Sequence, residues 1–162
     1  FHVGGHWLGL PATQVVEALQ TRHIKALPDS SSLLAGIMQH QDKVLPVIHL
    51  GRALGEPEQP QLAGERQVVV IERHSDGARL GLVVDALGEI PSIAASQIKP
   101  MRGLLAQTDD IASAGIARVS GQDGGERLLT LVSADYLWRH IQQAQTLLQA
   151  EQPLPELRSL AA

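Results

Sequence analysis

Histidine is the residue type in this sequence with the greatest capacity for chemistry, because imidazole binds zinc and transfers protons near neutral pH. The seven histidines are His2, His6, His23, His40, His49, His74 and His140. None forms the helical pair, or the tight group with a carboxylate, that a zinc site uses. His2 and His6 can meet across a turn, but two ligands make a poor site. We therefore expect no metal and no cofactor.

Two carboxylates within apolar segments are the next candidates. Asp85 interrupts the apolar run 82–87, and a catalytic acid there would need a neighbouring base or nucleophile that the sequence does not specify. A structural role, in which Asp85 accepts backbone N–H hydrogen bonds at a bend, explains it better. Glu17 also lies in an apolar segment, and two roles are open for it: a solvent-facing strand residue or part of a recognition surface. Because no set of candidate residues forms a catalytic group, the sequence favours a protein without enzymatic activity. A hydrolase using Asp85 and a histidine is the weakest alternative.

The composition excludes several classes of partner. A net charge of −4 and only four aromatic residues, Phe1, Trp7, Tyr136 and Trp138, disfavour nucleic acid, which needs a basic surface and stacking platforms. The absence of cysteine excludes disulfides and thiolate metal sites. No apolar run approaches the length of a membrane span, so we expect no membrane insertion and a cytoplasmic location. The sequence begins at Phe1 without a methionine, as expected of a domain within a longer protein.

The elements that must position these side chains are predominantly strands. The segment 36–50 predicts a hairpin with a polar tip over 39–43. Pro46 places its second arm at an edge, at a bulge, or where a strand leaves one sheet for another. Gly81 and Gly88 predict bulges or tight bends inside a long strand over 79–90. Apolar spacing of three and four over 134–151 predicts an amphipathic helix with Ser133 as its N-cap. Further strands are expected over 1–10 (two, around a Gly-Gly turn), 67–72, 111–119 and 127–132, while 13–19 is ambiguous between helix and strand. A hairpin turn is expected at 75–77, where the sequence reads Ser-Asp-Gly.

Many short strands separated by turn signals, with one helix at the end, predict an all-β barrel or sandwich closed by a C-terminal helix. We expect the β domain to occupy residues 1–132, and the helix and a tail to occupy 133–162.

Several motifs in this order resemble the CheW-like domain of bacterial chemosensory pathways. The matching segments are VE at 16–17, LP at 27–28, GIM at 36–38, KVLPVIHL at 43–50, GLVVDALGEI at 81–90, IKP at 98–100, IASAGIA at 111–117 and LLTL at 128–131. The resemblance implies two intertwined five-stranded SH3-like barrels without enzymatic activity. It also implies an adaptor that joins the cytoplasmic tips of chemoreceptors to the regulatory domain of a CheA-type histidine kinase.

On this resemblance, two groups of residues acquire expected roles. Partner binding is expected of the strand residues Val16 and Glu17 and of the hairpin tip, which consists of Gln39, His40, Gln41, Asp42 and Lys43. Structural roles are expected of Gly36, Pro46, Gly81, Asp85 and Gly88.

The hairpin tip is also where the sequence departs from the family. The family carries Asn-Leu-Arg-Gly at the positions of 39–42, so its arginine and glycine are replaced by Gln41 and Asp42. A permanent charge with five N–H donors is therefore missing from the tip. An alternative function, from another class, is a small-molecule sensor that binds an aliphatic ligand between the two barrels.

Overall fold

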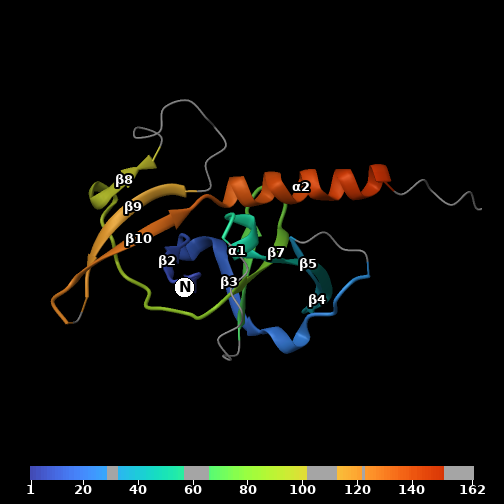
Figure 1. Ribbon diagram of the computed structural model, residues 1–162, viewed down its shortest axis with the longest axis horizontal. Coiled ribbons are helices and arrows are strands. Elements are labelled where there is room, and N and C mark those ends of the chain that lie inside the picture. Colours follow the sequence, from blue (N-terminus) through green and yellow to red (C-terminus); the bar gives the residue numbers. More distant parts are fainter. Residues whose placement is uncertain (29–32, 57–65, 102–112, 122, 152–162) are drawn as a thin grey trace, which may run out of the picture.

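The protein consists of two five-stranded sheets and one long helix, which follows the first sheet and lies over the second (Figure 1). The computed structural model describes residues 1–28, 33–56, 66–101, 113–121 and 123–151. In the first sheet the strands lie in the order β1 (His2–Val3), β2 (His6–Gly9), β10 (Glu126–Val132), β9 (Ser113–Ser120) and β8 (Ile98–Pro100). In the second the order is β3 (Val15–Gln20), β6 (Gln67–Arg73), β7 (Ala78–Val84), β5 (Lys43–His49) and β4 (Leu34–His40). The all-β prediction with a C-terminal helix is confirmed.

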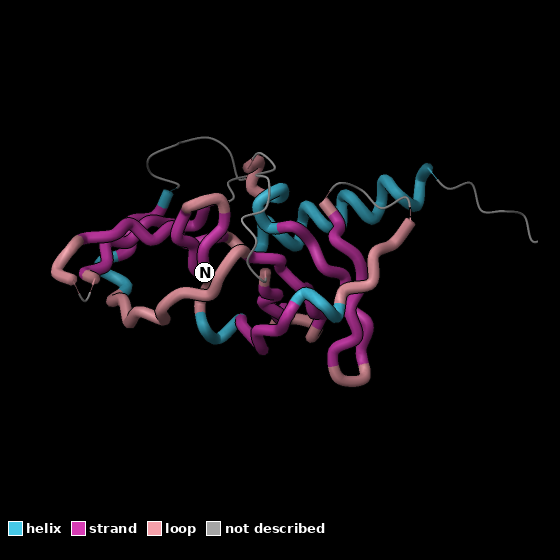
Figure 2. Tube along the Cα trace, turned by 60° about the horizontal axis from the view of Figure 1, so that its bottom comes forward, coloured by secondary structure: helices cyan, strands magenta, loops and turns pink. Residues whose placement is uncertain are grey.

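Each sheet curls into an incompletely closed barrel, and the two form adjacent groups of strands in Figure 2. An isolated antiparallel bridge from Lys25, which follows β3, to Ile37 on β4 joins the two edges of the second sheet. A second bridge joins His2 on β1 to Ala86, which follows β7. The Lys25–Ile37 bridge stands where a closed second barrel would have a continuous ladder, whereas the His2–Ala86 bridge ties the first sheet to the chain that leaves the second.

Two apolar cores follow from the alternation of side chains along β6 and β7. Val68 and Val70 face the interior of the second barrel, together with Met38, Leu45 and Val47. Val69 and Ile71 face the opposite way, into a core shared with the first sheet and the helix. Because both faces of β6 are buried, its sequence is a continuous run of valine and isoleucine rather than an alternating one.

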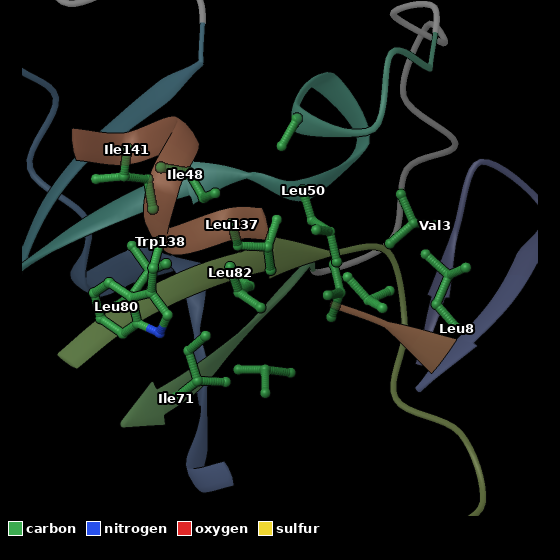
Figure 3. Packing of buried hydrophobic residues seen from close by; sticks show 14 residues of the cluster. Val3, Leu8, Ile48, Leu50, Ile71, Leu80, Leu82, Leu137, Trp138 and Ile141 are labelled. Carbon is green, nitrogen blue, oxygen red and sulfur yellow. The ribbon is translucent and has the colours of Figure 1, made fainter. Parts of the chain in front are cut away.

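Helix α2 (Ala134–Glu151) matches the predicted range. The Ser133 hydroxyl accepts a hydrogen bond from the Tyr136 N–H at 3.3 Å, as an N-cap does. Leu137, Trp138 and Ile141 then pack onto the shared core, where Figure 3 shows them above β7 and β6. The short helices are α1 (Leu50–Ala53) and the 3-10 turns η1 (Ala12–Gln14), η2 (Thr21–His23) and η3 (Ala95–Gln97).

Several local predictions hold. The hairpin forms as β4 and β5, the Gly4-Gly5 turn separates β1 from β2, and residues 74–77 form the turn between β6 and β7. The ambiguous segment 13–19 is mostly the strand β3. Residues 111–112, at the start of the expected strand 111–119, lie outside the described residues, as does the tail 152–162.

Two predictions about the segment 79–90 are wrong. Strand β7 ends at Val84, because the chain leaves the sheet there and the Leu87 N–H donates to the Gln67 side chain rather than to a ladder. Gly81 is not at a bulge, since the register between β6 and β7 is regular throughout. A Cβ at Gly81 would lie 2.9 Å from Val68 Cγ1 and 3.0 Å from Val47 Cγ2, so the glycine makes room for apolar side chains inside the barrel.

Candidate protein-interaction site

One end of the second barrel is covered by polar side chains, which we call the polar end cap. Its members are Glu17, His40, Lys43, Glu72 and Arg79, one from each of the five strands. Each stands two residues along its strand from an interior residue, in turn Leu19, Met38, Leu45, Val70 and Gly81. Because side chains two residues apart share a face, the interior side of every strand ends in a polar or charged group here.

His40 is the centre of the polar end cap. Its side chain is only 4% exposed and is the one buried polar side chain among the residues that the structure describes. Nε2 lies 2.8 Å from Glu17 Oε2, and Nδ1 lies 3.2 Å from Arg79 Nη1. A guanidinium can only donate, so Nδ1 must accept and the imidazole proton resides on Nε2, which donates to Glu17. Both ring nitrogens are thus satisfied in the neutral form of His40.

Arg79 joins the rest of the cap. Its Nε donates to Glu72 Oε2 at 2.7 Å, across the β6–β7 ladder. This hydrogen bond is the main reason that the pKa of Glu72 is lowered, with the positive charges of Arg79 and Lys43 adding to it. With His40 neutral, two carboxylates face two permanent cations, and the cap carries no net charge.

Arg79 also reaches the hairpin tip, where its Nη1 donates to Gln41 Oε1 at 2.9 Å. Gln41 has φ +55°, the one positive φ of a residue other than glycine in the described part of the chain. A left-handed backbone costs about 1–2 kcal/mol for such a residue, and two-residue hairpins usually place glycine or asparagine there. A hydrogen bond from a charged donor contributes roughly 1.5–3 kcal/mol. The contact from Arg79 is therefore strong enough to hold the strained tip.

The predicted partner-binding residues divide into two groups. The structure brings Glu17, His40 and Gln41 together through Arg79. The side chains of Val16, Gln39, Asp42 and Lys43 are exposed around them.

A register shift between Val15 and Glu17 places Val16 at a bulge in β3, which leaves it 39% exposed. Sequence reasoning missed Arg79 and Glu72, and it also missed Val44, an apolar side chain that is 67% exposed beside Gln39.

The residues with expected structural roles lie where segments of the chain meet or approach closely. A Cβ at Gly36 would lie 2.2 Å from the carbonyl oxygen of Lys25, so the bridge that joins the edges of the barrel requires glycine there. The expected edge or bulge position of Pro46 is wrong, because β5 lies between β7 and β4 and the register shift of this hairpin falls on β4. Pro46 is tolerated because it precedes the part of β5 that pairs with β7. Asp85 is exposed and accepts the Gly4 N–H at 2.8 Å. The space beside Gly88 is too small for most side chains, since a Cβ there would lie 3.2 Å from Trp7 Nε1.

A cavity of about 590 Å³ lies between the two sheets. Its lining comes from β3 (Val15, Ala18), from the first sheet (Leu129, Leu131) and from the crossing segment 87–93. Leu87 and Ile90, both on that segment, are 44% and 87% exposed. The lining is mostly apolar, so the cavity is suited to an aliphatic surface.

The described ranges contain neither a metal site nor a membrane-spanning helix. No group of three or more His, Asp or Glu side chains in that part of the chain could hold a metal ion. Among the same residues, no helix is both long enough and apolar enough to cross a bilayer.

Comparisons with known proteins agree with this architecture. The sequence profile of the CheW-like domain matches residues 1–142, which extends past β10 into α2. The protein FrzA of Myxococcus xanthus is 38% identical over 58 residues, a match that spans 36% of this chain and 36% of FrzA. The scaffolding protein TtCheW of Thermoanaerobacter tengcongensis has a similar structure, with a TM-score of 0.67 at 22% identity over 82% of this chain and 85% of TtCheW.

Proposed function

Because the chain belongs to the CheW-like domain family, we propose that it is a non-enzymatic adaptor of a chemosensory pathway, which binds the regulatory domain of a CheA-type histidine kinase and the cytoplasmic tip of a chemoreceptor. The observation that carries the proposal is the family match over residues 1–142, together with the two five-stranded sheets that the family fold requires. We expect the adaptor to act in the cytoplasm.

Two exposed apolar surfaces support binding to two partners at once. The first is the mouth of the cavity between the sheets, where Ile90 is 87% exposed and which suits the apolar face of a receptor helix. The second is the outer face of the β4–β5 hairpin, where Val44 is 67% exposed next to Gln39. We expect each to form part of an exchangeable interface of about 800 Å² per partner.

Titration of the protein with a cognate CheA-type regulatory domain and, separately, with a receptor-tip fragment tests the proposal. We expect Ile90→Asp and Val44→Asp each to weaken binding of a partner by about tenfold or more, because a charge would be buried without a counter-charge. Neither should lower thermal stability, since both side chains are exposed. Leu128→Asp is the matched control, because Leu128 is 62% exposed on β10, outside both surfaces. Failure of the unmodified protein to bind either partner at high micromolar concentration would refute the proposal.

The cavity also favours a second candidate function, a sensor for a small aliphatic ligand. Its volume of about 590 Å³ falls within the range of about 300–1,000 Å³ typical of ligand pockets. A thermal-shift screen of aliphatic compounds separates the two functions, since a ligand at about 100 times its dissociation constant adds about 2.7 kcal/mol to the free energy of unfolding.

A further inference from the structure

The hairpin tip is held from a neighbouring strand rather than by its own residues. Arg79 on β7 contacts three groups with its guanidinium: Glu72 at 2.7 Å, Gln41 at 2.9 Å and His40 at 3.2 Å. The Arg79 side chain as a whole is only 16% exposed, and its guanidinium is engaged by all three groups. A cation in this position serves mainly to hold other groups in place, and little of it can reach a partner.

The two tip residues that Arg79 holds are those whose conformation needs support. Gln41 has the left-handed backbone, and its side-chain oxygen is the acceptor for Arg79. His40 is buried and needs a donor at Nδ1 so that its Nε2 proton points to Glu17. One guanidinium therefore fixes both the turn of the hairpin and the orientation of the histidine that ties the hairpin to β3.

We propose that Arg79 is the positioning residue of the hairpin surface: it supplies from β7 the cation that fixes the tip, and it leaves the exposed face of the tip uncharged at position 41. This inference rests on the proposed adaptor function for its partner. It adds the chemistry of that partner opposite Val44, Gln39 and Gln41, where we expect an apolar patch and neutral hydrogen-bonding groups. A charged group of the partner would pair instead with Asp42 or Lys43, which are also exposed at the tip.

The positioning role is tested on the isolated protein by NMR, without any partner. Arg79→Met is expected to shift the Gln41 amide and its φ-dependent coupling, and to change the His40 ring ¹⁵N pattern from the fixed Nε2–H tautomer to a mixture. Arg79→Lys should preserve part of the pattern, because an ammonium can donate to one acceptor but lacks the fork. Arg118→Met is the control, since Arg118 is 71% exposed on β9 and pairs only loosely with Glu126 at 3.8 Å. Unchanged His40 and Gln41 signals in Arg79→Met would overturn the proposal.

An exchange of the two side chains gives a second test that does not depend on Arg79→Met remaining folded. Gln41→Arg alone places two guanidinium groups together, so we expect it to disturb the tip. Adding Arg79→Gln restores one donor and one acceptor in reversed positions, and the His40 ring signals should move back towards those of the unmodified protein. Arg79→Gln alone completes the cycle, and if the His40 shifts of the double variant equal the sum of those of the two single variants, the proposed contact is contradicted.

Partner-binding measurements then show whether the loss of Arg79 affects recognition at the hairpin surface. Arg79→Met should weaken binding of the CheA-type regulatory domain or of the receptor-tip fragment, whichever contacts Val44, by about tenfold, while Arg118→Met leaves it unchanged. Equal affinity of the Arg79→Met variant and the unmodified protein would refute the role of Arg79 in recognition. If the unmodified protein binds neither partner, the adaptor function fails, and the NMR measurements still decide whether Arg79 positions the tip.

Discussion

The clearest prediction concerns Gly36, where the second barrel is bridged. Gly36→Ala introduces a Cβ that would lie 2.2 Å from the Lys25 carbonyl oxygen, on a residue with φ +148°. Two hydrogen bonds are at risk, from the Lys25 N–H to the Ile37 oxygen at 2.8 Å and from the Ile37 N–H to the Lys25 oxygen at 2.9 Å. Each contributes about 1 kcal/mol, and the backbone strain adds about 1–2 kcal/mol. We expect a loss of about 3–4 kcal/mol in the free energy of unfolding.

Gly55→Ala isolates the part of this loss that comes from the bridge. Gly55 also has a positive φ, +77°, but a Cβ there would meet nothing within 4 Å, so only strain of about 1 kcal/mol is expected. Urea unfolding gives both free energies, and hydrogen exchange should show faster exchange of the Lys25 and Ile37 amides in Gly36→Ala alone. Equal destabilisation by the two substitutions, with these amides still protected, would refute the reasoning.

Two further predictions concern the helix and the β6–β7 turn. Leu137→Ala should lower the free energy of unfolding by about 2–5 kcal/mol, because Leu137 is fully buried where α2 meets the shared core; a loss below 1 kcal/mol in urea would mean that the helix contributes little. Hydrogen bonds from the Arg73 side chain and then from the Ala78 N–H lower the pKa of Asp76 to about 2, so its contribution to stability is complete above the unfolded value of 3.8 and is lost as the pH falls from about 4 to about 2. The stability difference between the unmodified protein and Asp76→Asn, followed by circular dichroism, should shrink over that interval, and a constant difference would contradict the assignment.

Local sequence patterns were sufficient for much of the fold. The β4–β5 hairpin, the turn before β7 and the range of α2 all depend on residues close together in the chain, such as Ser133 at the start of the helix. The end of β7 at Val84 and the role of Gly81 depend on what lies opposite them in space. Apolar residues resume after Asp85 as Ala86 and Leu87, so the sequence alone leaves the end of the strand open. In the structure the Leu87 N–H donates to the Gln67 side chain and the chain crosses to the other sheet, which ends the strand at Val84.

Only part of the candidate site could be predicted, because some of its contacts join residues that are distant in the sequence. Glu17, His40 and Gln41 could be identified from the sequence because they lie at or near apolar strands. Arg79, which connects them, is far from all three in the sequence. Arg79 was indistinguishable from a solvated strand residue until the register placed it opposite Glu72. The alternation of side chains along the strands could have identified both residues. Glu72 is on the same face of β6 as Val68 and Val70, and Arg79 is on the same face of β7 as Gly81 and Val83.

The arrangement of the two cores has a consequence for synthesis. The interior of the second barrel uses residues from Leu19 to Val83, so its parts are all present once β7 has been made. The shared core instead extends from Val3 to Ile141 and cannot be completed before α2 emerges. At about 5–20 residues per second, the 58 residues from Val83 to Ile141 take roughly 3–12 s to synthesise. During that interval one face of β6 is incompletely covered on the nascent chain, because only the earlier members of the shared core, such as Val3 and Leu50, are present. The addition of α2 completes the cover and ends the exposure of that face to chaperones and to aggregation.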